Sequence, residues 1–179
     1  RIYFHGNNKS RDELIMACRY CIGRIVVDNF YELELLNAVC AAEGRVQDIM
    51  LRITPGIEAH THEYIKTGQF DSKFGFTIGE QAMNGIKRAI ASKFLNLTGI
   101  HCHVGSQIFE MESFRNTAAV MVDFIGEVKN ESGYEFQELD VGGGFGIYYY
   151  HGDKPSLPQE WAEAVIPTVE QKCRQIGVK

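Results

Sequence analysis

Three consecutive glycines, with a fourth soon after, follow an apolar strand in the stretch Leu139-Asp140-Val141-Gly142-Gly143-Gly144-Phe145-Gly146. Each glycine in an extended segment costs roughly 0.5–1 kcal/mol relative to alanine, so the triplet costs about 2 kcal/mol. A fold accepts this cost where the backbone turns sharply or another group approaches it closely. Because successive N–H groups without a Cβ can surround an anion, we predict that Gly142, Gly143 and Gly144 bind a phosphate; a tight strand-to-loop turn is the alternative.

A second stretch that could do chemistry is Gly99-Ile100-His101-Cys102-His103-Val104-Gly105-Ser106-Gln107. His101 and His103 are two residues apart, so in a strand they point to one face. We favour the interpretation that this face contacts a planar cofactor. The second interpretation is a pair of buried, hydrogen-bonded histidines, and the third is a metal site with H-x-H spacing. The metal site ranks last, because the only carboxylates at strand ends are Asp28 and Asp140.

Short apolar segments alternate with amphipathic ones along the chain, which predicts a β-α unit repeated five times. The expected strands are residues 2–4, 24–28, 48–53 and 97–106, and a fifth that ends in the glycine stretch. Ser10 and Asn29 are predicted to cap the first two helices. Pro167 lies inside the last helix and should bend or split it.

Polar residues follow every predicted strand: Asn7 and Asn8, Asp28, Arg52, His101 and His103, and Gly142 to Gly144. Doubly wound sheets and (β/α)8 barrels both place sites at the carboxyl ends of parallel strands. A doubly wound sheet concentrates its site at one switch point, whereas here all five strand ends carry such residues. We therefore predict an α/β fold that is a partial (β/α)8 TIM barrel. A complete barrel needs eight units, so residues 1–179 are expected to form a single incomplete barrel domain of about five central β-α units.

The composition excludes several classes of function. The chain of 179 residues has a net charge of −5 and no basic run, which argues against nucleic-acid binding, and no apolar run is long enough to cross a membrane. Its five cysteines lie at apolar positions and are expected to be reduced, which favours a cytoplasmic protein. The chain starts within a strand and stops where another should follow, so we expect a piece of a longer protein.

Four stretches occur in a fixed order: Phe4-His5-Gly6-Asn7-Asn8-Lys9-Ser10, Arg52-Ile53-Thr54-Pro55-Gly56, His103-Val104-Gly105-Ser106-Gln107 and Asp140-Val141-Gly142-Gly143-Gly144-Phe145-Gly146. Together they resemble the diaminopimelate decarboxylase family, pyridoxal-phosphate enzymes with the alanine-racemase-like barrel. Residues 61–68 and 73–75 are similar to that family as well. Ornithine and arginine decarboxylases share the glycine triplet and His-Val-Gly-Ser but usually differ at Gly6-Asn7-Asn8-Lys9, and they remain the alternative.

The resemblance implies a role for each matching residue. His103 would stack on the ring of pyridoxal 5'-phosphate, Ser106 would lie near its phosphate, and residues 142–144 would bind the phosphate. Arg52 would lie near the side of the ring that carries its oxygen substituent and would act with His103 in catalysis, while the Schiff-base lysine would precede residue 1. Lys9 does not match that lysine and is expected to be solvated at a helix start.

The resemblance also implies an activity, the decarboxylation of meso-2,6-diaminopimelate to L-lysine and CO2 by a homodimer with a shared active site. Residues 55–76, which show no helix or strand period, would border the substrate pocket and the partner subunit. The isolated chain, without the lysine, is expected to be inactive. A non-catalytic pyridoxal-phosphate-binding protein and a metal-dependent barrel hydrolase that uses His101 and His103 are the alternatives of other classes.

Overall fold

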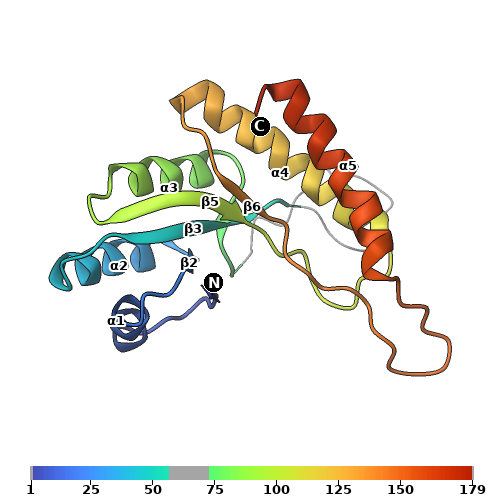
Figure 1. The fold of residues 1–179 in the computed structure, drawn as a ribbon, viewed down its shortest axis with the longest axis horizontal. Helices are drawn as coiled ribbons and strands as arrows, with labels where there is room; N and C mark the ends of the chain where they lie inside the picture. The colour runs from blue at the N-terminus through green and yellow to red at the C-terminus, as the bar shows by residue number, and fades with distance from the viewer. Residues whose placement is uncertain (1, 57–72, 179) are drawn as a thin grey trace. The chain divides into compact units, whose positions relative to one another are not determined.

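The computed structural model describes residues 2–56 and 73–178, which form two compact units. Unit 1 comprises residues 2–54, 73–101 and 136–140, and unit 2 comprises residues 55–56, 102–135 and 141–178. The described strands and the first three helices belong to unit 1, and the last two helices belong to unit 2 (Figure 1). Within these ranges, no helix is both long and apolar enough to span a membrane.

Unit 1 is built on a parallel sheet with the strand order β1-β2-β3-β5-β6, and β4 pairs with β3 outside this path. The elements are β1 Tyr3–Phe4, α1 Arg11–Arg19, β2 Arg24–Val27, α2 Phe30–Ala42, β3 Gln47–Thr54, β4 Phe76–Thr77, α3 Glu80–Ala91, β5 Leu95–His101 and β6 Glu138–Asp140. The predicted alternation of strands and helices is confirmed, but the strand predicted over residues 97–106 ends at His101, so His103 lies beyond it and does not share a strand face with His101. The two-residue strand β4 was not predicted, because it is too short to show a period.

The first two helices begin at the predicted caps. The Oγ of Ser10 accepts the N–H of Glu13, whose carboxylate accepts the N–H of Ser10 at 2.7 Å, so α1 starts with a capping box. The Oδ1 of Asn29 accepts the N–H of Glu32 at 2.9 Å at the start of α2. All four residues of β2 are buried, as expected for a parallel strand covered on both faces.

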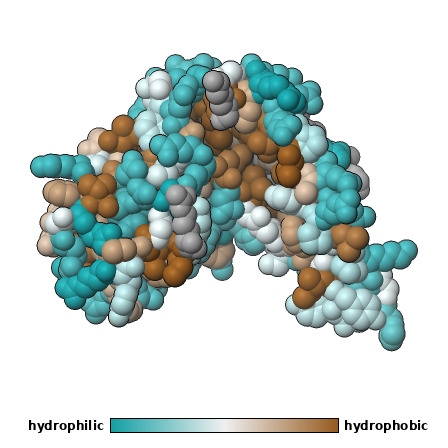
Figure 2. Space-filling view, in the orientation of Figure 1, coloured by the Kyte–Doolittle hydropathy of each residue, from teal (hydrophilic) through white to brown (hydrophobic). Residues whose placement is uncertain are grey.

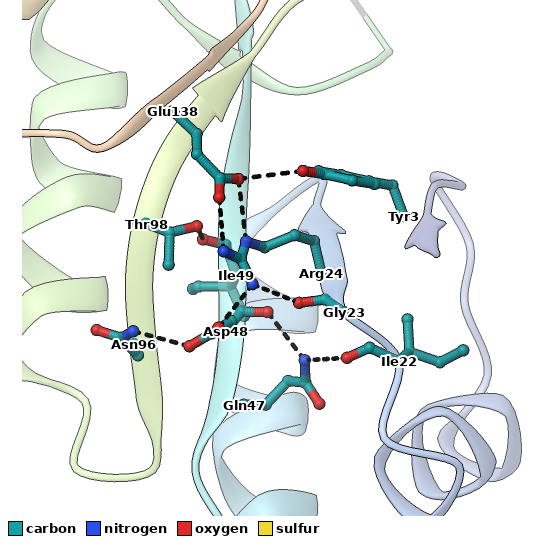
Figure 3. Close-up of polar contacts among 10 residues, drawn as sticks. All are labelled: Tyr3, Ile22, Gly23, Arg24, Gln47, Asp48, Ile49, Asn96, Thr98 and Glu138. Atoms are coloured by element: carbon teal, nitrogen blue, oxygen red, sulfur yellow. Dashed lines mark hydrogen bonds and ion pairs between the residues drawn. The ribbon is translucent and has the colours of Figure 1, made fainter. Parts of the chain in front are cut away.

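The sheet of unit 1 is curled. Arg24 begins β2 and Glu138 begins β6, and two strands lie between them. Neighbouring strands are about 4.8 Å apart, so three steps across a flat sheet would separate the two backbones by about 14 Å. The Nη2 of Arg24 lies 2.6 Å from the Oε1 of Glu138, and its Nη1 lies 2.6 Å from the Oδ2 of Asp48 on β3 (Figure 3). The hydroxyl of Tyr3 on β1, one strand further away, also donates to the Oε2 of Glu138 at 3.3 Å. Four steps across a flat sheet would separate these two backbones by about 19 Å, more than the two side chains can span. This curled parallel sheet with helices between its strands is a partial (β/α)8 TIM barrel, as predicted.

Unit 2 is built on two long helices, α4 (Met111–Ser132) and α5 (Pro158–Ile176), which lie side by side. The Nζ of Lys129 donates to the carbonyl of Gly177 at 2.8 Å, so the carboxyl ends of the two helices meet. Hydrophilic residues predominate over α5 on the face shown in Figure 2. The helix α5 continues through Pro167, so the expectation of a split there is wrong; packing of one face on α4 maintains the helix despite the missing N–H.

Candidate functional site

The glycine stretch follows β6 and lies in unit 2. Gly142 has a φ of +72° and Gly144 a φ of +105°, in the left-handed region that favours glycine. A Cβ at either position would lie within 3.0 Å of a backbone oxygen, that of Cys102 for Gly142 and that of Gly105 for Gly144. The local backbone therefore requires glycine at both positions.

Gly143, between them, is under neither constraint. Its φ lies outside the left-handed region, and among the described residues other than its chain neighbours no heavy atom lies within 4 Å of the place of a Cβ. The surrounding protein therefore does not account for glycine here, and the space beside the backbone is open. Successive backbone amides of residues that lack a Cβ, beside open space, fit an anion such as a phosphate.

Backbone hydrogen bonds join the glycine stretch to the segment that follows β5. The N–H of Ile108 donates to the carbonyl of Gly144 at 2.9 Å, and the N–H of Gly146 donates to the carbonyl of Ile108 at 2.8 Å. The side-chain amide of Gln107 donates to the carbonyl of Ile147 and accepts its N–H, both at 2.9 Å. Gln107 thus holds the end of the loop. The sequence did not predict this role, although Gln107 ends one of the four stretches that resemble the family.

His103 and Ser106 lie in the same segment after β5, and both are exposed. The Cε1 of His103 lies 3.5 Å from the place of a Cβ on Gly144, so the imidazole ring borders the glycine stretch. An exposed ring beside a loop of bare amides fits a ligand that has a flat ring and a phosphate. Five of the six predicted site residues therefore lie on two adjoining segments of unit 2: His103, Ser106, Gly142, Gly143 and Gly144.

An apolar cluster packs these two segments against α4 and α5. Its buried members are Ile108, Phe114, Ala118 and Val165, and partly buried side chains such as Val104 and Val141 pack on them. The ring of Phe145 meets the rings of Phe114 and Trp161 edge to face, with centroids 5.4 Å and 5.7 Å apart. The cluster contains residues from both segments and both helices, so it helps to fix the glycine stretch in place.

Arg52, the sixth predicted residue, lies in unit 1 at the carboxyl end of β3. It is in register with His101 on β5, which is in register with Asp140 on β6. The Nη1 of Arg52 lies 3.3 Å from the Oδ1 of Asp28, and its guanidinium carbon lies 4.6 Å from the ring centroid of Phe74. The Nδ1 of His101 lies 3.1 Å from the Oδ2 of Asp140. A row of charged and polar residues thus crosses the carboxyl ends of these strands. Most of the predicted pocket-bordering segment, residues 57–72, lies outside the described residues.

Lys9 is buried, so the expectation that it is solvated is wrong. It is 8% exposed, and its Nζ donates to the carbonyls of Gly6 at 2.6 Å and Val26 at 2.7 Å and to the Oε1 of Glu32 at 2.6 Å. Three acceptors from three elements offset the cost of removing the ammonium from water. Burial raises the pKa of the Glu32 carboxyl, and the Lys9 ammonium opposes this rise.

His5, which follows β1, was also missed as a strand-end residue. Its ring centroid lies 4.7 Å from that of His101 in an edge-to-face arrangement. Partial burial lowers the pKa of His5, and His101 adds to this lowering. In the part of the chain that the structure describes, no group of three or more His, Cys, Asp or Glu side chains could hold a metal ion. The metal interpretation therefore gains no support from these residues.

A curled parallel sheet with charged residues at its carboxyl ends, and a loop of bare amides beside an exposed imidazole, are features of α/β-barrel proteins that bind phosphate-bearing cofactors. Residues 1–179 match the family described as pyridoxal-dependent decarboxylase, pyridoxal binding domain. The chain belongs to this family, whose cofactor is pyridoxal phosphate.

Several named proteins are similar to the chain over nearly its whole length. Diaminopimelate decarboxylase of Bacillus subtilis is 46% identical over 99% of the chain, and that of Halalkalibacterium halodurans is 47% identical over 98%. Crystal structures of diaminopimelate decarboxylase from M. jannaschii, one of them in complex with L-lysine, give TM-scores of 0.88 and 0.87 at 34% identity, over 98% and 97% of the chain. The chain spans 40% of the length of each of these proteins.

Proposed function

We propose that a longer protein containing this chain decarboxylates meso-2,6-diaminopimelate to L-lysine and CO2 with pyridoxal phosphate. The observation that carries this proposal is the similarity to diaminopimelate decarboxylases over nearly the whole chain. The glycine stretch supports the cofactor part independently, because Gly143 is a glycine that the surrounding protein does not require.

The cofactor supplies an electron sink for the pair released when the carboxylate leaves as CO2. We propose that the backbone amides of residues 142–144 and the hydroxyl of Ser106 bind its phosphate, and that the imidazole of His103 packs on its ring. Arg52 would supply a positive charge to the site. Residues 1–179 would then be one incomplete barrel domain that carries part of the cofactor site.

We also propose that the protein works as a homodimer in the cytoplasm. The loop after the glycine stretch exposes three consecutive tyrosines, Tyr148, Tyr149 and Tyr150, each between 57% and 70% exposed, and exposed aromatic side chains are enriched at protein interfaces. The thiols of Cys18 and Cys40 lie 3.4 Å apart and share a hydrogen bond without forming a disulfide, which agrees with a reducing compartment.

The direct test is to assay the purified full-length protein for CO2 release from diaminopimelate, ornithine and arginine, each with and without added pyridoxal phosphate. We expect cofactor-dependent release from diaminopimelate, with L-lysine as the second product, and at least tenfold lower kcat/KM for the other two. Faster release from ornithine or arginine would show that the proposed substrate is wrong and would leave the proposed cofactor unchanged. Binding of the cofactor without release from any amino acid would instead favour a non-catalytic carrier.

A further inference from the structure

A buried ion pair joins three elements of unit 1 at the carboxyl ends of its strands. Lys9 and Glu32 have side chains that are 2% and 4% exposed, and their charged atoms lie 2.6 Å apart. All three N–H groups of the Lys9 ammonium have acceptors, one in the loop after β1, one at the end of β2 and one in the first turn of α2. The pair therefore fixes the position of these three elements relative to one another.

The same pair holds the residue that contacts Arg52. The second carboxylate oxygen of Glu32 accepts the N–H of Asp28 at 3.0 Å. The carboxylate of Asp28, a residue only 3% exposed, lies 3.3 Å from the guanidinium of Arg52, and the ring of Phe74 packs on that guanidinium. A continuous series of contacts thus runs from Lys9 to Arg52, and each member is held by at least one neighbour.

Stability alone is a weak reason for this arrangement. Removing two charges from water costs about as much as their attraction returns, so apolar residues of similar size often serve equally well in a buried pair. The buried pair is better suited to fixing the orientation of neighbouring groups, because charged hydrogen bonds have defined geometry. None of Lys9, Glu32 and Asp28 is exposed enough to meet a substrate.

We propose that Lys9, Glu32 and Asp28 are positioning residues that hold the guanidinium of Arg52 in one orientation for its interaction with the bound cofactor. The proposal rests on the proposed role of Arg52 in the cofactor site. They act through Arg52 and touch neither substrate nor cofactor themselves. The expected consequence is that removing them mimics, in part, the removal of Arg52 itself.

The test uses the visible absorbance of the cofactor bound to the full-length protein, titrated with pH in the absence of substrate. Arg52→Ala is the reference variant. Loss of a positive charge beside the cofactor disfavours its deprotonated form, so the midpoint should move to higher pH by about 1 unit. The test variant is Lys9→Met combined with Glu32→Met, which removes both charges together and leaves neither unpaired. Its control is Arg24→Met combined with Glu138→Met, a second and less buried ion pair of unit 1, at the amino ends of the strands.

We expect the Lys9/Glu32 double variant to shift the midpoint in the same direction as Arg52→Ala and to lower kcat/KM about tenfold or more. The Arg24/Glu138 control should leave the midpoint unchanged at a similar loss of thermal stability. An unchanged midpoint in the Lys9/Glu32 variant, or in Arg52→Ala itself, would overturn the inference, and so would an equal shift in the control.

Asp28→Ala gives a second, independent answer, which also decides the case if the double variant does not fold. If Asp28 positions Arg52, its loss moves the midpoint to higher pH, as loss of Arg52 does. If Asp28 acts only through its negative charge, its loss leaves Arg52 more effective and moves the midpoint to lower pH, which contradicts the inference, as does an absence of any shift. These titrations need no substrate, so a failure of the proposed decarboxylation would be seen separately in the CO2 assay.

Discussion

Substitution of Gly143 by alanine separates the demands of the fold from those of the ligand. No heavy atom of the described residues other than its chain neighbours lies within 4 Å of the new methyl group, and the backbone is not left-handed. The folded protein therefore accepts the methyl group without strain, and alanine restricts the unfolded chain more than glycine does. We expect the free energy of unfolding to rise by about 0.4–1 kcal/mol.

Cofactor affinity should change in the opposite direction. If the amide of Gly143 donates to the cofactor phosphate, the methyl group lies in the space that the phosphate needs and weakens that hydrogen bond. A hydrogen bond to a charged group contributes about 1.5–3 kcal/mol, and 1.4 kcal/mol corresponds to a factor of ten. The dissociation constant of pyridoxal phosphate should therefore rise about 10- to 100-fold in an absorbance titration of the full-length apoprotein.

Two glycine variants serve as controls. Gly144→Ala places a Cβ within 3.0 Å of the Gly105 oxygen at a φ of +105°, so it should lose about 1–3 kcal/mol of stability as well as affinity. Gly133→Ala, at the end of α4, has a φ of +71° and no neighbours within 4 Å among the described residues, so it should lose stability and keep affinity. Wild-type affinity in Gly143→Ala would refute the assignment of this amide to the phosphate.

Three further predictions concern single side chains. Gln107→Ala removes both hydrogen bonds to Ile147 and should cost about 1–2 kcal/mol, with a measurably larger dissociation constant for the cofactor; an unchanged constant would show that the loop is held by its backbone alone. The folded-state pKa of His5 lies below 6.5, so the unfolded state binds more protons and the free energy of unfolding should fall as pH drops through 6.5. His5→Gln should reduce that fall in urea titrations at pH 7 and pH 5. Burial and the contact with Cys18 raise the pKa of Cys40 to about 12, so a thiol reagent at pH 8 should label exposed Cys21 and spare Cys40 in the native protein, as peptide mass analysis would show.

Five of the six residues predicted for the site lie on adjoining segments of unit 2, and their role in cofactor binding stays a prediction. The sequence signals for these residues are local. A run of glycines at a strand end has few physical explanations, and the assignment of His103 and Ser106 rests on the resemblance of one short motif to the family. The two helix caps at Ser10 and Asn29 were predictable for the same reason, since a cap and its partner are three residues apart.

Contacts between distant residues could not be predicted. Lys9 precedes a helix cap, a position that is usually solvated, and only the fold brings Val26 and Glu32 to its ammonium. Gln107 and Ile147 are forty residues apart, so nothing near either residue indicates their paired hydrogen bonds. The contact of Asp28 with Arg52 depends on the register of β2 with β3, which places Val27 opposite Leu51.

Two charge networks lie at opposite ends of the sheet of unit 1, and their positions predict different effects on stability and on the cofactor. At the amino ends, Arg24 forms ion pairs with Glu138 and Asp48 across the curled sheet (Figure 3). At the carboxyl ends, Lys9 and Glu32 form a pair that is at least as well buried, next to the charged row. Barrel enzymes place their sites at the carboxyl ends, while the amino ends contribute mainly to stability. Loss of either network should therefore lower the melting temperature, whereas only loss of the carboxyl-end network should alter the bound cofactor.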